Sequence, residues 1–145
     1  MVQQDEDGLR ILASEIEQYR TQIQQVEHQI QTIQFARERM NTCRETIQEL
    51  KKKKEGDNIL VPLRGDVYLQ AKIHNLNSII VGIGAEIAVE SNLEEAEKRI
   101  AVKIEEMEKS VERYSQLYSQ LILTYKEQQQ KLQQYLDRTP KKKTH

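Results

Sequence analysis

The stretch Asn58–Glu90, NILVPLRGDVYLQAKIHNLNSIIVGIGAEIAVE, decides the fold of this chain of 145 residues. Four short segments within it, 59–63, 67–73, 78–83 and 86–89, are rich in Ile and Val and are separated by turn residues, which predicts four strands. Arg64-Gly65-Asp66 suits a tight reverse turn, and residues 74–77 suit a longer one. The simplest interpretation is two β-hairpins in series, with Gly84-Ala85 closing the second.

The apolar residues of these strands alternate with polar ones. Almost every odd position is apolar, whereas the even positions include Gln70, Lys72, Glu86 and Glu90. Alternation of period two predicts one buried face and one wet face. Eleven large side chains are expected on the buried face, where they form an oligomer interface: Ile59, Val61, Leu63, Val67, Leu69, Ile73, Ile79, Val81, Ile83, Ile87 and Val89. Their burial is worth on the order of 20 kcal/mol as an upper bound.

This apolar face needs a cover that the chain itself lacks. Isolated two-stranded hairpins are marginal in water. The long segments on either side of the strands are helical, and each has an apolar seam of its own to bury. The sequence therefore predicts that the same region of other subunits covers the strand face.

The first helix has a heptad pattern. Its a positions are Leu9, Ile16, Ile23 and Ile30, and its d positions are Leu12, Tyr19, Val26 and Ile33. Such a seam predicts a coiled coil. Arg37 and Arg44 stand at the next a positions, and a frame shifted by three residues restores an apolar seam through Ala36, Met40, Cys43, Ile47 and Leu50. This shift predicts a stammer between Ile33 and Met40, which locally overwinds a coiled coil.

The ends of the two helices carry their own signals. Lys51–Lys54 could bind nucleic acid, but cations followed by Gly56 are more typical of a helix C-terminus with a glycine cap. Ser91 and Glu94 form a capping box that predicts the start of the second helix. Its heptad seam consists of Leu93, Ile100, Met107, Tyr114, Leu121, Gln128 and Tyr135 together with Ile104, Val111, Tyr118, Tyr125 and Leu132.

The two helices have matching lengths, so they can fold back on each other. The expected fold is mainly α with a small β part, an antiparallel two-helix coiled-coil hairpin with two β-hairpins between the helices. We expect a first coiled-coil helix over residues 1–57, an oligomerisation platform over 58–90, a second helix over 91–137 and a disordered basic tail over 138–145.

Composition and motifs exclude several function classes. A net charge of −1 argues against a polyanion-binding chain, and no apolar run approaches the length of a membrane span. The single Cys43 and the absence of metal-ligand spacing predict no disulfide, no metal and no cofactor, and they fit a reducing, cytoplasmic compartment. No nucleophile–base set and no phosphate-binding loop is visible, so the chain is not expected to be an enzyme.

The strand block and its flanking helices resemble the prefoldin family, specifically its alpha-class subunits. The resemblance is most specific in 59–63 (ILVPL), in 67–73 (VYLQAKI), and in 80–84 (IVGIG) followed by Val89-Glu90. Alpha-class subunits carry two β-hairpins between the helices, whereas β-class subunits carry one. The heptads alone would not identify any family.

The resemblance implies a hexamer of two alpha-class and four β-class subunits whose hairpins form a double β-barrel platform. It also implies that the tips of the coiled coils hold non-native proteins without ATP and pass them to a group II chaperonin. The tip residues predicted to bind clients are Leu9, Ile11, Leu12, Leu132, Tyr135 and Leu136.

Two readings of these tip residues stay open. Leu9, Leu12, Leu132 and Tyr135 could simply close the coiled coil, whereas Ile11 and Leu136 lie outside the seam and can offer apolar surface to a client. The alternative function is a structural coiled-coil adaptor or tether, in which the β block is only an oligomerisation clamp.

Overall fold

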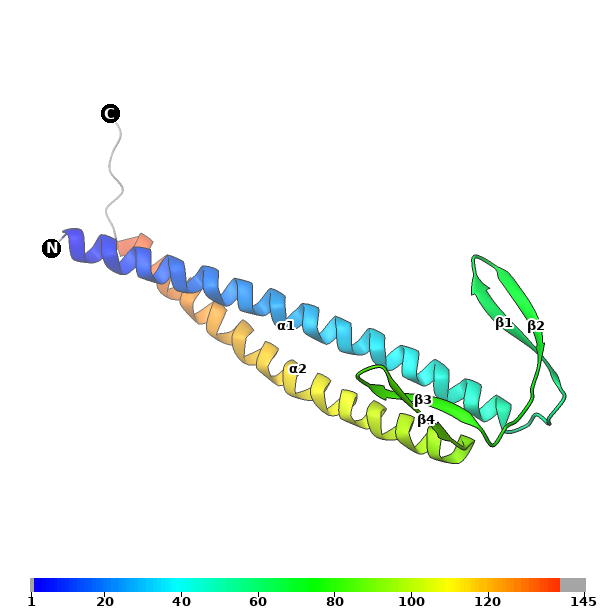
Figure 1. Ribbon diagram of the computed structural model, residues 1–145. Coiled ribbons are helices and arrows are strands. Elements are labelled where there is room, and N and C mark those ends of the chain that lie inside the picture. The colour runs from blue at the N-terminus through cyan, green and yellow to red at the C-terminus, as the bar shows by residue number, and fades with distance from the viewer. Residues whose placement is uncertain (1, 139–145) are drawn as a thin grey trace. The chain divides into compact units, whose positions relative to one another are not determined.

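The structure, a computed structural model, describes residues 2–138 of the chain. Its elements are α1 (Val2–Leu50), β1 (Asn58–Arg64), β2 (Val67–Lys72), β3 (Ile79–Gly84), β4 (Ile87–Ser91) and α2 (Leu93–Arg138) (Figure 1). The strands form two separate antiparallel sheets, β1 with β2 and β3 with β4. The predicted fold of two long helices with two β-hairpins between them is confirmed. Of the predicted tail 138–145, Arg138 is the last residue of α2, and residues 139–145 lie outside the described residues.

The chain folds as two compact units. The terminal unit combines the chain up to Gln34 with the chain from Lys109 onward, and the hairpin unit is Phe35–Glu108. In the terminal unit the start of α1 lies beside the end of α2, because a β-carbon placed on Gly8 would be 3.5 Å from Tyr135 Oη. Ile16 and Ile23 are buried in the seam of this antiparallel pair, as the heptads predicted.

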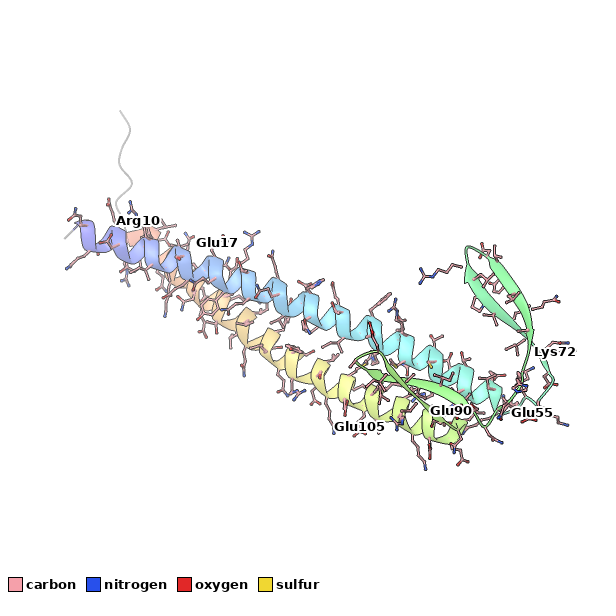
Figure 2. All side chains as sticks on the ribbon, in the orientation of Figure 1. Arg10, Glu17, Glu55, Lys72, Glu90 and Glu105 are labelled. Atoms are coloured by element: carbon pink, nitrogen blue, oxygen red, sulfur yellow. The ribbon has the colours of Figure 1, made fainter. Side chains whose placement is uncertain are left out.

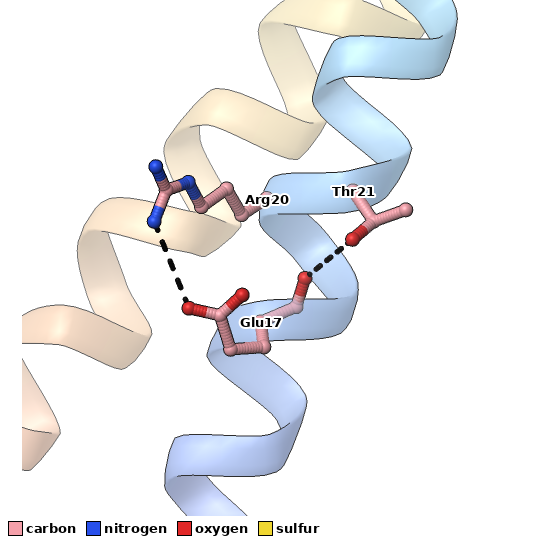
Figure 3. A network of polar contacts seen from close by, with 3 residues as sticks. All are labelled: Glu17, Arg20 and Thr21. Atoms are coloured by element: carbon pink, nitrogen blue, oxygen red, sulfur yellow. Dashed lines mark hydrogen bonds and ion pairs between the residues drawn. The ribbon is translucent and has the colours of Figure 1, made fainter.

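The outward surface of α1 in the terminal unit is polar. Arg20 and Glu17 form an ion pair with an Nη1–Oε1 distance of 3.7 Å, and the Thr21 hydroxyl donates a 3.0 Å hydrogen bond to the Glu17 carbonyl (Figure 3). Both charged groups are largely exposed, so the pair contributes little to stability. The free energy that holds the two helix segments together therefore comes from the apolar seam.

The predicted stammer in α1 is wrong. Cys43 is exposed, whereas Arg37 and Arg44 are half-buried, and Ile47 is buried at the d position of the original frame. The seam therefore keeps its heptad frame through the arginines. Arginine is compatible with such a position because its aliphatic stem can lie along apolar neighbours while the guanidinium reaches water.

The two hairpins have the same backbone design, repeated after 20 residues. Ile59 pairs with Ala71 and Pro62 with Tyr68 in the first, and the equivalent pairs in the second are Ile79 with Ser91 and Gly82 with Ala88. Each hairpin has an irregularity before a two-residue turn, between Pro62 and Arg64 and between Gly82 and Gly84. Each also has three successive positive φ angles, at residues 64–66 (86°, 64°, 61°) and 84–86 (104°, 50°, 61°).

The end of α1 differs from the prediction. The helix ends at Leu50, and Gly56, with φ of 86°, lies six residues farther on. Instead of capping the helix, Gly56 donates its amide to the Ile73 carbonyl at 2.8 Å, while the Ile73 amide donates to Asp57. Gly56 and Asp57 therefore extend the base of the first hairpin. The Lys51 ammonium forms an ion pair with Glu97 of α2.

The start of α2 is also shifted by one residue. Asn92, not Ser91, is the N-cap, because its side-chain oxygen accepts a 2.8 Å hydrogen bond from the Glu95 amide. Ser91 still belongs to β4 and is buried, and its hydroxyl donates to the Glu95 carboxylate at 3.0 Å. The sequence placed the cap early because Ser91 and Asn92 are both good N-cap residues.

Candidate functional site: hairpin faces and the tip groove

The first candidate site is the inner face of the two hairpins, which consists of the eleven apolar side chains predicted to form an oligomer interface. Only Ile73 is buried in the single chain. Those near the hairpin bases are half-buried: Ile59, Ile79, Val81 and Val89. Those near the turns are exposed: Val61, Leu63, Val67, Leu69, Ile83 and Ile87. The uncovered part is therefore the turn half of both hairpins.

The registers bring these side chains to one face of each hairpin. Val61 lies opposite Leu69 in the first, and Val81 lies opposite Val89 in the second. Cross-strand apolar pairs of this kind stabilise a sheet only when a further layer removes them from water. Within the described residues no element covers the turn half of the first hairpin, so its inner face is open for another chain.

The second hairpin has partial cover within the hairpin unit. An open groove of about 400 Å³ lies between β3 and α2, lined by Val81, Gly82 and Ile83 on one side and by Lys98, Arg99, Val102, Lys103 and Glu106 on the other. Val102 remains exposed in this groove. The second hairpin is thus partly shielded by the chain's own helix, and the first is not.

The outer face, opposite the inner one, is less polar than the alternation predicted. In the first hairpin it consists of Leu60, Pro62, Tyr68, Gln70 and Lys72, and in the second of Ile80, Gly82, Ala88 and Glu90. Leu60, Tyr68 and Ile80 are exposed. The even-numbered positions were expected to be wet, and these three apolar side chains were missed. The 20-residue repeat, which places Leu60 and Ile80 at equivalent positions, is the sequence signal that could have revealed those two.

The second candidate site is the tip groove of the terminal unit. This groove of about 350 Å³ is lined by Gly8, Ile11, Leu12, Glu15, Gln128, Lys131, Gln134, Tyr135 and Arg138. It brings together three of the six predicted client-binding residues, namely Ile11, Leu12 and Tyr135. Leu9, Leu132 and Leu136 do not line it.

Exposure divides the six predicted tip residues into two groups. Leu9, Leu12 and Leu132 are half-buried between the helix segments, where they contribute to the seam. Ile11, Tyr135 and Leu136 are exposed. Gly8 was not predicted, yet it is the only glycine of α1. Because it has no side chain, it leaves room for Tyr135 at the groove floor.

Neither site has the features of a metal centre. No group of three or more His, Cys, Asp or Glu side chains among residues 2–138 could hold a metal ion. No helix in that range is both long and apolar enough to cross a membrane. What the two sites offer is apolar surface with a polar rim, which suits recognition of other polypeptides.

Comparison with known proteins identifies a family that the chain matches over most of its length. The family model described as "Prefoldin subunit" matches residues 19–138. Prefoldin subunit alpha of Pyrococcus horikoshii is 29% identical over 111 residues, covering 76% of this chain and 75% of its own length. Prefoldin subunit alpha of Methanococcoides burtonii is 28% identical over 121 residues, covering 83% of this chain and 88% of its own.

A solved structure shows the same fold. The cryo-EM structure of filamentous PFD from Methanocaldococcus jannaschii aligns with a TM-score of 0.55 and 23% identity, covering 83% of this chain and 94% of that one. The family match extends over most of both helices and all four strands. The chain therefore belongs to the prefoldin family of chaperone subunits, and its similarity is to the alpha-class members that its two β-hairpins resemble.

Proposed function

We propose that this chain is the alpha-class subunit of a hexamer that contains two copies of it and four β-class subunits. The observation that carries this proposal is the exposed inner face of the hairpins, from Val61 to Leu69 in the first and at Ile83 and Ile87 in the second. A face of this size is costly to leave in water. Hairpins of neighbouring subunits cover it by continuing each sheet into a closed β-barrel platform, which leaves few open strand edges.

The terminal unit is the part that holds clients. The tip groove and the exposed Ile11, Tyr135 and Leu136 bind apolar segments that a folded protein would bury and a non-native one displays. Each contact is weak, but several coiled coils acting on one client raise the overall avidity. No step of this holding requires ATP, and the client then passes to a group II chaperonin.

We place this activity in the cytoplasm. The single Cys43 has no intrachain partner and is exposed, which suits a compartment that keeps thiols reduced. The charged tip residues Glu15, Lys131 and Arg138 at the groove rim keep the apolar surface small. A small, divided patch limits self-association of the tips while leaving room for client side chains.

The test is suppression of client aggregation by the assembled complex, measured by light scattering. Replacing Ile11 and Leu136 by Ser removes exposed apolar surface and should raise the amount of complex needed about fivefold, since the avidity of several tips multiplies a modest loss at each. The matched control is Leu123→Ser, because Leu123 and Ile11 are both 61% exposed and only Ile11 lines the tip groove.

Deleting residues 1–12 and 132–145 should abolish holding while the hexamer stays intact. If the complex with full-length, unmutated chains assembles but does not suppress aggregation, the proposed holding function is wrong, and the coiled-coil adaptor becomes the better proposal. Equal loss of holding in the Leu123→Ser control would contradict the assignment to the tip.

A further inference from the structure

The inner face of the second hairpin lies partly against the chain's own helix. Figure 1 shows β3 beside the first turns of α2, and Figure 2 adds the side chains, with Glu90 of β4 and Glu105 of α2 labelled. Val81 and Ile83 were predicted to contact other subunits, yet both line the open groove that β3 shares with α2. One apolar face therefore has two candidate covers, the helix of the same chain and a partner subunit.

The helix brings an apolar residue to this groove that the coiled-coil seam does not use. Ile104 is buried in the seam, whereas Val102, two positions earlier, lies on nearly the opposite side of α2, because each residue turns the helix by about 100°. The groove side of α2 is one continuous stripe at helical spacing, which consists of Lys98, Arg99, Val102, Lys103 and Glu106. α2 therefore has a second face, directed at the hairpin instead of into the seam.

This stripe covers the hairpin only loosely. Apart from Val102, its residues are long charged side chains, whose aliphatic stems can lie along apolar surface while their charged heads stay in water. Lys98, Arg99 and Lys103 form no ion pair with any residue in the range 2–138. Ile83 is still 50% exposed and Val102 54% exposed. A partner strand that buries more of this apolar surface can therefore displace the stripe, because the additional burial is favourable.

The connections of the second hairpin allow such a displacement. Asn92 alone separates β4 from α2, and residues 73–78 separate β2 from β3. Backbone changes in a few residues at the ends of elements are enough to move a packed unit as one piece. The registers of β3 and β4 can therefore be kept while the hairpin leaves the helix.

We propose that residues 98–106 of α2 cover the inner face of the second hairpin in the free chain and release it when a partner subunit takes their place. The inference rests on the function proposed above, in which partner subunits cover the inner faces. The cover shields the half-buried Val81 before assembly. It also competes with the partner, because only the released fraction of the chains can bind. The first hairpin has no equivalent cover, and its Leu69 is 55% exposed.

Cross-linking of the full-length chain tests the cover. Ile83→Cys and Val102→Cys are combined in a Cys43→Ser background and treated with a short, cleavable bifunctional thiol reagent. Mass spectrometry should find the intrachain product in high yield in the free chain, and prior addition of a β-class prefoldin subunit should lower the yield about fivefold or more. Leu69→Cys replaces Ile83→Cys in the matched control, because Leu69 is similarly exposed but does not line the groove.

The same cross-link, made before mixing, tests whether release is required for assembly. The locked chain should assemble with the β-class subunit about tenfold more weakly or worse, and cleavage of the reagent should restore assembly. Val102→Cys with Glu106→Cys is the control, because a link between neighbours on one helix places the reagent in the groove without fastening the hairpin. Native mass spectrometry measures the assembly, and circular dichroism checks that each variant is folded.

A single substitution should act in the direction opposite to the loss of an interface residue. Val102→Ser weakens the cover and should raise the apparent affinity for the β-class subunit about threefold, since more chains have a released hairpin. Leu123→Ser removes an exposed apolar side chain of α2 outside the groove and should leave the affinity unchanged.

Each part of the experiment has an outcome that would overturn the proposal. Equal cross-link yields from positions 83 and 69 in the free chain would contradict the cover. An unchanged yield in the assembled hexamer, a locked chain that assembles normally, or weaker assembly of Val102→Ser would contradict the exchange. If the chain without any cross-link forms no hexamer, the proposed function is wrong and the exchange with it, while the yield in the free chain still decides whether the cover exists.

Discussion

The first and second β-hairpins have the same registers, the same irregularity before the turn and the same run of positive φ angles, yet their surroundings differ. The first exposes most of its inner face, whereas the second shares a groove with α2 and has Val81 and Val89 half-buried. The difference teaches that a hairpin backbone can be specified locally, while the burial of its side chains depends on what lies beside it. The first hairpin leaves more of its inner apolar face exposed in the single chain than the second does.

A carboxylate placed on the inner face should cause the largest loss of assembly affinity. Its effect on chain stability should also differ between the two hairpins. Leu69→Asp changes an exposed side chain, so the stability of the isolated chain should change by less than about 0.5 kcal/mol. Val89→Asp changes a half-buried one and should destabilise the chain by about 1–3 kcal/mol. Both should weaken assembly with a β-class subunit about a hundredfold or more, because an unpaired charge becomes buried.

Native mass spectrometry measures this assembly, and urea unfolding measures the stability of each chain. Leu123→Asp is the control, since it places the same charge at an exposed position of α2 outside the hairpins. If Leu69→Asp assembles as the wild-type chain does, the first hairpin is not covered by a partner.

Exchanging the residue types at the equivalent turn positions 64 and 84 should change the stability of the two hairpins in opposite directions. Gly84, with φ of 104°, is the equivalent of Arg64, with φ of 86°, and both angles are unfavourable for a residue with a side chain. Gly84→Arg should therefore destabilise the second hairpin by about 1–3 kcal/mol. Arg64→Gly should stabilise the first by about 1 kcal/mol, because the relief of strain exceeds the added entropy of the unfolded chain.

Hydrogen exchange of the strand amides reports each hairpin separately, since local opening is measured residue by residue. Faster exchange in the first hairpin of Arg64→Gly would mean that the arginine is not strained there.

A substitution at the junction of the second hairpin with α2 should cause the next largest loss of stability. Asn92→Ala removes the oxygen that accepts from the Glu95 amide and should cost about 1 kcal/mol of helix stability. Asn92→Asp keeps an accepting oxygen and should retain the wild-type value. Exchange of the amides of residues 94–96 is the measurement, and equal exchange in the two variants would contradict the cap.

Ala85→Gly should have the smallest effect. Ala85 has φ of 50°, and its equivalent in the first hairpin is Gly65. Glycine removes the steric cost of the left-handed conformation but adds unfolded-state entropy, so a gain of about 0.5 kcal/mol is expected. Gly65→Ala should show a loss of similar size in the exchange of the first hairpin, and a gain there would contradict the shared turn design.

The elements of the fold could be predicted from the sequence because each has a local signal. The heptads from Leu9 to Ile33 identify the first helix, and the alternation around Val61 and Val81 identifies the hairpins. The stammer was predicted wrongly because a sequence pattern counts Arg44 as polar and exposed, although the residue is half-buried. The N-cap was misplaced because Ser91 and Asn92 have similar capping preferences.

The sites were only partly predictable for a different reason. Most of the inner face is exposed in the single chain although alternation predicted a buried face, and alternation alone did not reveal the apolar Leu60, Tyr68 and Ile80 on the outer face. At the tip, the sequence suggested six apolar residues, but which of them line the tip groove depends on how the two helices face each other. The contribution of Gly8 follows from its place beside Tyr135, which no local pattern contains.

The central claim is that partner subunits cover the inner faces of the hairpins, and the native mass of the assembly tests it most directly. The full-length chain is measured alone and after mixing with a β-class prefoldin subunit. A discrete hexamer with two copies of this chain and four of the partner is the predicted result. A stable monomer or simple dimer that ignores the partner would contradict the claim, because the exposed side chains from Val61 to Leu69 would then remain in water.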